Sequence, residues 1–250
     1  MADETYTPGH TGNATSFMAQ RSLESHGAFF APYVESTHVV LDAGCGPGTV
    51  TLGLAKAASS GRVSGVDFAE SQVAAARENA NQSGVHNAEF VTASCYELPF
   101  EDGTFDRVFS HALMEHLARP VDAMREFARV LKPGGMVGVC SPDFDGTVLA
   151  PASTELSAAK GAYADLQKFN GGDLRIGKKL GSYLSEAGFV EVSMSARYEC
   201  YPSLEFIGEY LAKQLDATQQ PEHAACFRDW MTQAAGMFAQ CWVSAIGTKP

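Results

Sequence analysis

The stretch Val39-Val-Leu-Asp-Ala-Gly-Cys-Gly-Pro-Gly-Thr49 decides the fold. Its first half belongs to a short apolar run rich in β-branched residues, which predicts a buried strand over 37–43. Three glycines, Gly44, Gly46 and Gly48, end that run. Glycines allow a tight turn and let a ligand approach the backbone closely, at the carboxyl edge where such sheets bind cofactors. The stretch therefore predicts a strand, a ligand-binding turn and a helix, in that order.

Strands and helices alternate along the first 143 residues. Apolar runs predict strands at 62–68, 88–94, 105–111 and 136–140, and helical periodicity predicts helices at 49–58, 71–81 and 120–131. Strands that alternate with helices favour a parallel sheet with helices on both faces. The expected fold class is therefore α/β, with a Rossmann-like, doubly wound sheet.

The remaining segments predict an α-helical cap on the same domain. Helical stretches are expected at 14–34, 154–168, 176–187, 203–217 and 221–239, with strands at 188–198 and 241–247. Because no stretch rich in Gly, Ser or Pro separates a second domain, we expect one domain, residues 1–250. Its expected parts are an N-terminal cap helix (1–36), a cofactor-binding core (37–143), an inserted cap and helix (144–186), and C-terminal strands with inserted helices (187–250).

Composition limits the class of partner. The chain has 250 residues, with 18 Lys and Arg against 29 Asp and Glu, for a formal net charge of −11. Nucleic-acid binding needs a basic footprint, so no nucleic acid is expected as a partner. No apolar run approaches the ~18 residues of a membrane span. The polar, acidic start Met1-Ala-Asp-Glu-Thr5 lacks the basic and apolar regions of a signal peptide, which favours a cytoplasmic protein.

The six cysteines, at 45, 95, 140, 200, 226 and 241, lack the spacing of metal ligands. No two form a CxxC pair, and no His stands near them at the spacing of a zinc site. They are interpreted as small core residues in a reducing compartment, and no metal is expected. The alternative is a soft-metal or metalloid site that the fold assembles from distant cysteines.

The glycine turn and the acid that follows it predict a nucleoside site. Asp67 ends the second strand 23 residues after Gly44, where a carboxylate can accept both hydroxyls of a ribose, and Phe68 can lie against an adenine. A dinucleotide fingerprint would need a glycine at Thr49, and a phosphate-binding loop would need Gly-Lys-Ser/Thr. Taken singly, the glycines could form a turn that binds no ligand, and Asp67 could serve only to cap the next helix. In this order and at this spacing they favour ligand binding.

Five motifs in order resemble those of the class I S-adenosylmethionine-dependent methyltransferases. They are Val39–Gly48, Gly65-Val-Asp-Phe68, Tyr96-Glu-Leu-Pro-Phe-Glu-Asp-Gly-Thr-Phe-Asp106, Met114-Glu-His-Leu117 and Arg129-Val-Leu-Lys-Pro-Gly-Gly135. Within this family the chain is similar to the menaquinone/ubiquinone-type C-methyltransferase branch, which includes many N- and O-methylating enzymes. Stretches 170–189 and 242–247 also resemble that branch. The resemblance covers most of the chain and implies a seven-stranded sheet, mostly parallel with the last strand antiparallel.

The resemblance also implies S-adenosylmethionine as the cofactor and assigns residues to it. The expected cofactor contacts are Tyr6, Arg21, Asp42, Ala43, Gly44, Cys45, Gly46, Asp67, Phe68, Ser94, Cys95, Tyr96, Ser110 and His111. Arg21 would pair with the methionine carboxylate or stay an exposed helix charge, and Tyr6 would close over the site. The family often has Asp-Ala after strand three, where this chain has Ser94-Cys95. A serine is a weaker partner for the adenine amine, although backbone groups can serve.

Methyl transfer places few demands on catalytic residues. The cofactor carries the activated group, so the enzyme must align nucleophile and methyl group and exclude water. A general base is needed only where the acceptor loses a proton. His111, at the end of strand four, and Asp143, after strand five, are the expected candidates. Asp143 could instead cap the next turn, and His116 is interpreted as a packing or capping residue.

The predicted function is C-, N- or O-methylation of a small-molecule acceptor with release of S-adenosylhomocysteine. The aromatic residues of the cap segments suit a planar or apolar acceptor, although aromatic residues pack cores equally well. A homodimer is left open. One alternative is a protein that binds S-adenosylmethionine in a regulatory or non-methyl-transfer role. Another is a nicotinamide oxidoreductase, against which Thr49 argues.

Overall fold

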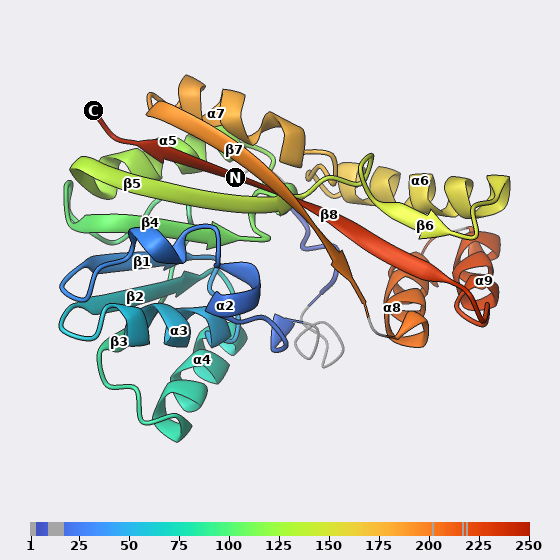
Figure 1. Ribbon diagram of the computed structural model, residues 1–250, viewed down its shortest axis with the longest axis horizontal. Coiled ribbons are helices and arrows are strands. Elements are labelled where there is room, and N and C mark those ends of the chain that lie inside the picture. The colour runs from blue at the N-terminus through green and yellow to red at the C-terminus, as the bar shows by residue number, and fades with distance from the viewer. Residues whose placement is uncertain (1–3, 10–17, 202, 217, 219) are drawn as a thin grey trace.

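The computed structural model describes residues 4–9, 18–201, 203–216, 218 and 220–250. An eight-stranded sheet runs through it in the order β3-β2-β1-β4-β5-β8-β6, and β7 pairs with β8 (Figure 1). The strands are β1 (Val39–Ala43), β2 (Arg62–Asp67), β3 (Ala88–Thr92), β4 (Phe105–His111), β5 (Leu131–Pro142), β6 (Val148–Ala150), β7 (Val190–Cys200) and β8 (Met237–Thr248). The Rossmann-like α/β fold is confirmed. The short strand β6 was not predicted from the sequence.

The strand directions bring the predicted cofactor segments to one edge. Strands β1 to β5 are parallel, with Ala43 opposite Val66 and His111 opposite Cys140. Strand β8 runs antiparallel to β5, β6 and β7. The glycine turn after β1 and the end of β4 therefore meet at the carboxyl edge of the sheet, where ligands of open α/β sheets bind.

Helices cover both faces of the sheet (Figure 1). Their bounds are α3 (Thr49–Ala57), α4 (Glu70–Gln82), α5 (Pro120–Val130) and α7 (Leu180–Glu186). Side chains of α3 and α4 pack with one set of buried sheet residues, including Val40 and Val63, while α5 and α7 pack with the other set, including Leu41 and Val139. This alternation along β1 is the period-2 pattern of a strand buried on both faces. No helix in the described segments is long and apolar enough to cross a membrane.

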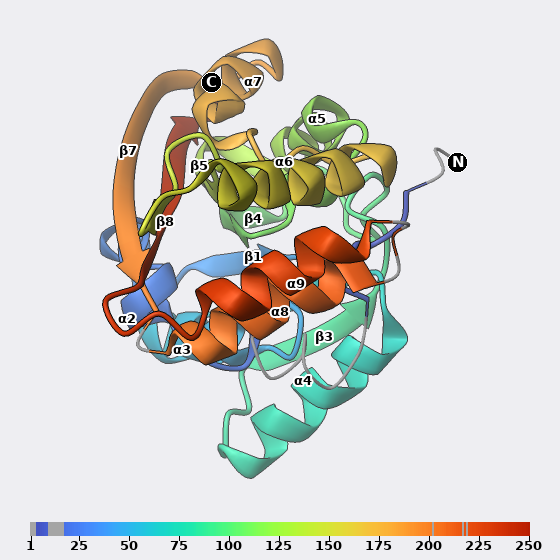
Figure 2. The same cartoon turned by 90° about the vertical axis from the view of Figure 1, so that its right-hand side faces the viewer.

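The cap consists of helices α6 (Thr154–Phe169), α8 (Leu204–Asp216) and α9 (Pro221–Trp230), beyond the carboxyl edge of the sheet (Figures 1 and 2). These helices have a hydrophobic core of their own, which includes Tyr163, Leu211 and Phe227. The sequence predicted one helix over 221–239, and this is wrong. Helix α9 ends at Trp230, whose indole N–H donates to the carbonyl of Ala150 at 3.0 Å. Residues from Met237 onward join the sheet instead.

The predicted helix over 14–34 is also wrong in its described part. Met18 is helical, but residues 19–34 contain one α-helical turn, α2 (Leu23–His26), and a 3₁₀ turn, Ala31–Tyr33, and residues 14–17 lie outside the described part. Ser22 caps α2, and Gly27 ends it. The break lets Phe30 pack against β5, where its ring fills the space that a side chain at Gly138 would need. Burial of a large aromatic ring outweighs the hydrogen bonds of a longer helix.

The cysteines are dispersed through the fold. Cys45, Cys140 and Cys241 are buried, Cys95 and Cys226 are half-buried, and Cys200 is exposed. Within the described segments no three His, Cys, Asp or Glu side chains are grouped so that they could hold a metal ion. The arrangement gives no support to a metal site assembled from distant cysteines.

Candidate functional site

The glycine turn after β1 has the backbone shape that only glycine adopts without strain. The φ angles of Gly44, Gly46 and Gly48 are 76°, 52° and 79°. The backbone N–H groups of Gly44 and Cys45 donate to the carbonyl of Val66 at 2.8 and 2.9 Å, which ties the turn to β2. Gly48 then begins α3. Among the described residues, a Cβ atom at Gly46 would have one neighbouring atom within 4 Å, Met18 Sδ at 3.5 Å, so this glycine borders space that the described residues leave open.

Asp67 lies at the end of β2 and faces the turn. Its Oδ2 accepts a hydrogen bond from the Gly46 N–H at 2.9 Å, and its Oδ1 accepts one from the Ala69 N–H at 3.0 Å. The neighbouring Phe68 is 78% exposed. Asp67 thus has the local bond of a cap and also a contact with the glycine turn, and each carboxylate oxygen keeps a second lone pair for a ligand.

Three further predicted residues lie below the turn. The buried Asp42 accepts a hydrogen bond from the Thr51 hydroxyl at 2.6 Å, and burial raises the pKa of its carboxyl to about 7. The Ser110 hydroxyl donates to the carbonyl of Ala43 at 2.9 Å, and both residues are buried. Ser110 and Ala43 therefore join β4 to β1, whereas Asp42 reaches the cavity above the turn.

That cavity, which we call the loop pocket, measures about 330 Å³ with the solvent at its mouth included. Its lining comprises Met18, Arg21, Asp42, Gly44, Cys45, Gly46, Pro47, Thr49, Val50, Phe109 and His111. Six of the predicted cofactor contacts are among these residues. Ser94, Cys95 and Tyr96 follow β3 outside this lining. The Ser94 hydroxyl accepts a bond from the Tyr96 N–H at 3.2 Å, and the Tyr96 hydroxyl donates to Glu4.

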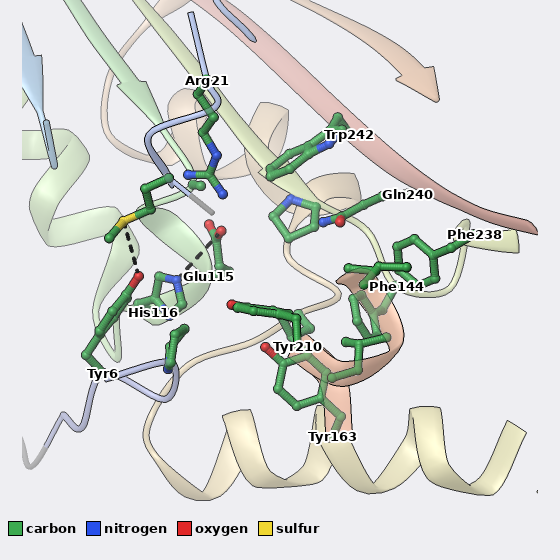
Figure 3. A pocket seen from close by; sticks show the side chains of 17 residues that line it. Tyr6, Arg21, Glu115, His116, Phe144, Tyr163, Tyr210, Phe238, Gln240 and Trp242 are labelled. Carbon is green, nitrogen blue, oxygen red and sulfur yellow. Dashed lines mark hydrogen bonds and ion pairs between the residues drawn. The ribbon is translucent and has the colours of Figure 1, made fainter. Parts of the chain in front are cut away.

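A second cavity, the aromatic pocket, lies between the sheet edge and the cap (Figure 3). It measures about 590 Å³, again with the solvent at its mouth included. Among the described residues, six aromatic side chains from widely separated segments line it: Tyr6, Phe144, Tyr163, Tyr210, Phe238 and Trp242. Tyr6 was predicted to close over the cofactor but lies in this pocket, edge-on to His116 with 4.6 Å between ring centroids. Met18 and Arg21 line both pockets.

Glu115 is the one acidic residue in the described lining of the aromatic pocket. It belongs to the 3₁₀ turn Met114–His116, and its Oε2 accepts a hydrogen bond from the Ser141 hydroxyl at 2.8 Å. Burial raises the pKa of the Glu115 carboxyl to about 7. Its Oε1 is 3.8 Å from His116 Nε2, but burial lowers the pKa of His116 to about 3, so this is a contact with a neutral imidazole and not an ion pair.

Sequence reasoning missed Glu115, because Met114-Glu-His-Leu117 was interpreted as a packing signature. A carboxyl inside an otherwise apolar turn directly after β4 was the signal that could have identified it. His116 fits the packing interpretation better. The side-chain amide of Gln167 donates to its Nδ1 at 2.9 Å and to the carbonyl of Glu115 at 2.7 Å, so α6 holds the turn in place.

Comparisons with known proteins agree with this geometry. A family model described as a methyltransferase domain matches residues 40–135. An uncharacterized methyltransferase of Schizosaccharomyces pombe is 32% identical over 191 residues, which make up 73% of this chain and 68% of the relative. A demethylmenaquinone methyltransferase of Staphylococcus aureus is 41% identical over 101 residues, 40% of this chain and 41% of that enzyme. The solved phosphoethanolamine N-methyltransferase 2 of Haemonchus contortus has a TM-score of 0.60 at 19% identity, over 96% of this chain and 57% of that one.

The chain belongs to the class I S-adenosylmethionine-dependent methyltransferases. The predicted family and cofactor are therefore confirmed, and the nicotinamide alternative is not supported. The open space beside Gly46 and the carboxylate of Asp67 fit a nucleoside that approaches the backbone. The individual contacts assigned to S-adenosylmethionine stay predictions.

The surroundings of His111 argue against its predicted role as the base of this methyltransferase. Its ring packs against Trp242 and His26, with centroids 4.6 and 5.0 Å away. Neither ring nitrogen has a hydrogen-bond partner among the described residues. Burial, followed by the positive charge of Arg21, holds the pKa of His111 well below its usual range. The imidazole is neutral, and it takes up a proton only at considerable cost.

Asp143 is also unsuited to the role predicted for it. It lines neither of the two pockets. Its Oδ1 accepts a bond from the Asp145 N–H at 3.1 Å, and its Oδ2 accepts one from the Lys178 N–H at 3.0 Å. These bonds match the capping alternative, because they fix the turn after β5 against the segment that leads to α7.

Proposed function

We propose that this methyltransferase moves a methyl group from S-adenosylmethionine in the loop pocket to a small acceptor in the aromatic pocket. The observation that carries this proposal is that the two pockets adjoin at Met18 and Arg21. Methyl transfer requires the nucleophile and the methyl group in line and in contact, which two adjoining cavities provide. The cap helices α6 and α8 contribute Tyr163 and Tyr210 to the wall of the aromatic pocket.

Residues around the loop pocket are suited to hold the cofactor by its three parts. Asp67 would accept the ribose hydroxyls, and the exposed Phe68 would lie against the adenine. The turn at Gly46 leaves room for the methionine half. Arg21, at the junction, would pair with the methionine carboxylate. S-adenosylmethionine supplies the activated methyl group, so these residues have to bind and orient rather than activate it.

The lining of the aromatic pocket supports a planar, largely apolar acceptor. The six aromatic rings in its described lining offer flat surfaces for stacking. Arg21 is the one Lys or Arg in its described lining, which disfavours an acceptor with a phosphate group, since such groups are bound by several donors and cations. The relatives are named for different acceptors, demethylmenaquinone in one case and phosphoethanolamine in the other. The family alone therefore does not select the substrate.

A paired experiment tests this division of labour. A metabolite library is screened for release of S-adenosylhomocysteine, and the acceptor found is used with two variants. Gly46→Val, in the loop pocket, should weaken S-adenosylmethionine binding measured by calorimetry. Tyr163→Leu, on the far wall of the aromatic pocket, should raise the acceptor KM and leave cofactor affinity near that of the wild type. Equal effects of both variants on both ligands would contradict the proposal, as would the absence of methyl transfer to any acceptor.

A further inference from the structure

We infer that Glu115 is the general base of this enzyme and that the acceptor is a phenol, an aromatic ring with an ionisable hydroxyl. The inference rests on the proposed function, because it takes the aromatic pocket as the acceptor site. It replaces His111 and Asp143, the two bases that the sequence suggested, with a residue that faces the acceptor.

The Glu115 carboxylate is fixed in a position from which it can contact a ligand in the aromatic pocket. Its turn follows β4 at the carboxyl edge of the sheet, and Ser141 at the end of β5 fixes one carboxylate oxygen at 2.8 Å. The carboxylate points into the middle of the pocket, with Arg21 on one side and the Tyr210 hydroxyl on another (Figure 3). Because one oxygen is anchored, the carboxylate presents its other oxygen in a defined direction.

The charge state of Glu115 suits proton transfer near neutral pH. Burial raises the pKa of its carboxyl, and Arg21 acts in the opposite direction. The titratable groups that interact with it from the elements packed around it are Arg21, His116, Cys140, Tyr6, Tyr163 and Tyr210. Burial keeps His116 and the three tyrosines uncharged at neutral pH. A base with a pKa near the working pH is both available and strong enough to accept a proton.

The charges in the pocket favour a neutral hydroxyl over a cationic acceptor. Arg21 contributes a positive charge at the junction, which the methionine carboxylate would balance, and the sulfonium of the cofactor adds another beside the acceptor. A protonated amine would bring a further positive charge next to the sulfonium in a buried space, which is costly. A phenol brings no charge, stacks on the aromatic walls, and offers a proton to Glu115.

Methyl transfer to the phenol couples the loss of its proton to cleavage of the C–S bond of the cofactor. The phenol O–H proton moves to a carboxylate oxygen of Glu115. The oxygen lone pair forms the new O–C bond to the methyl group as the C–S bond breaks, and the electron pair of that bond stays on sulfur. The products are an aryl methyl ether, S-adenosylhomocysteine and a neutral Glu115, which returns its proton to solvent.

Three probes with one ring system test the inference by binding. They are 2-naphthol, 2-methoxynaphthalene and 2-naphthylmethylamine, each titrated into the protein saturated with S-adenosylhomocysteine. At pH 8 we expect 2-naphthol to bind about 10-fold more tightly than its methyl ether, because a hydrogen bond to a carboxylate is lost in the ether. This preference should vanish in Glu115→Gln and at pH 5.5, where Glu115 is protonated. Methylation of the amine in preference to 2-naphthol, when S-adenosylmethionine replaces S-adenosylhomocysteine, would overturn the inference, as would a preference for 2-naphthol that Glu115→Gln retains.

Turnover provides a second readout that a structural role would not change. With S-adenosylmethionine, the wild type should convert 2-naphthol to 2-methoxynaphthalene, with a rate that rises with pH up to about 7. Glu115→Gln, which can still accept the Ser141 bond, should lose roughly 10²-fold or more of kcat, and the rise with pH, at unchanged cofactor affinity. Glu115→Asp should recover part of the rate. Glu101→Gln, on an exposed loop, is the control for the substitution itself.

The outcomes separate the inference from the proposed function. If amines or carbon acceptors are methylated and Glu115→Gln matches the wild type with them, the two-pocket function stands and the phenol inference is wrong. If 2-naphthol binds but no 2-methoxynaphthalene forms, the base role is wrong. If S-adenosylhomocysteine binds and no acceptor of any class is methylated, the proposed function itself is wrong, and the inference with it.

Discussion

The carboxylate of Asp67 accepts a hydrogen bond from the backbone N–H of Gly46 at 2.9 Å, so the end of β2 holds the glycine turn that follows β1. The two residues are 21 positions apart and meet because β1 and β2 are adjacent parallel strands. The acid predicted to bind the ribose therefore also shapes the turn that would receive the rest of the cofactor. Substitutions at Asp67 report on both roles.

Asp67→Ala should weaken S-adenosylmethionine binding by roughly 10- to 100-fold, because a charged acceptor typically contributes about 1.5–3 kcal/mol. Asp67→Asn should have an intermediate effect, since its amide oxygen still accepts one hydrogen bond. Isothermal calorimetry measures both affinities, and circular dichroism verifies the fold. An alanine variant that is folded and binds with wild-type affinity would contradict the assignment of Asp67 to the ribose.

Two glycines of the turn should respond differently to the same change. A Cβ at Gly48 would lie 2.8 Å from the Ala76 Cβ, whereas one at Gly46 would enter the loop pocket, 3.5 Å from Met18 Sδ. Gly48→Ala should therefore lower the free energy of unfolding by more than the ~1–3 kcal/mol of backbone strain alone. Gly46→Ala should carry that strain cost and also lose most cofactor binding. Urea unfolding and calorimetry separate the two effects, and equal loss of stability in both variants would be inconsistent with this packing.

Arg21 should recognise the amino-acid end of the cofactor and not its nucleoside end. Arg21→Met keeps the length and apolar contact of the side chain but removes its charge. We expect it to weaken S-adenosylhomocysteine binding by about 10-fold or more. Binding of 5′-methylthioadenosine, which lacks the carboxylate, should stay the same. A matched loss for both ligands would indicate that Arg21 supports the pocket instead of binding the carboxylate.

Sequence patterns predicted the parts of the fold that depend on local signals. The strands from 62 to 111 and the helices on either side of the sheet have strong periodicity and clear glycine or proline boundaries, so their type and order were predicted correctly. The segments 14–34 and 221–239 have equally helical patterns. There, distant contacts decide the outcome: Phe30 fits over Gly138, and residues from Met237 pair with β6 and β7.

The site was predictable where a motif fixes the backbone and not where it depends on the direction of a side chain. The glycine turn and Asp67 were found because their spacing is tied to adjacent strands. The sequence correctly placed His111 and Asp143 at the carboxyl edge of the sheet, but it did not reveal which side chains surround them. Glu115 was overlooked for the same reason. The cytoplasmic location and the homodimer stay predictions.

Asp143 should be a stability residue rather than a catalytic one. Both of its oxygens accept backbone hydrogen bonds, from Asp145 and Lys178, so Asp143→Ala leaves two N–H donors without their acceptor. We expect a loss of about 1–3 kcal/mol in the free energy of unfolding, measured in urea, with affinity for S-adenosylhomocysteine unchanged. A stable alanine variant whose turnover is abolished would restore Asp143 as a candidate base.

The buried carboxyl of Asp42 should make the stability of the protein depend on pH. Its pKa in the folded protein is about 7, above its ordinary value of 3.8, because burial penalises the charged form. The folded protein therefore binds a proton more tightly than the unfolded chain does. The contribution of this proton to stability is complete below pH 4 and is lost as the pH rises through about 7.

The side chain of Asp42→Asn cannot ionise. Without cofactor, the free energy of unfolding of the wild type should therefore fall relative to that of this variant between pH 4 and pH 8, by at most about 4 kcal/mol. Thr51→Val should have the opposite effect on the pH dependence of stability. It removes the hydroxyl that donates to Asp42 at 2.6 Å. The ionised carboxyl then loses its donor, and stability should fall more steeply with pH than in the wild type. Urea unfolding at intervals from pH 4 to pH 8 measures all three proteins. Parallel profiles for the wild type and Asp42→Asn would mean that Asp42 does not titrate in this range, and that the wall of the loop pocket carries a permanent negative charge at neutral pH.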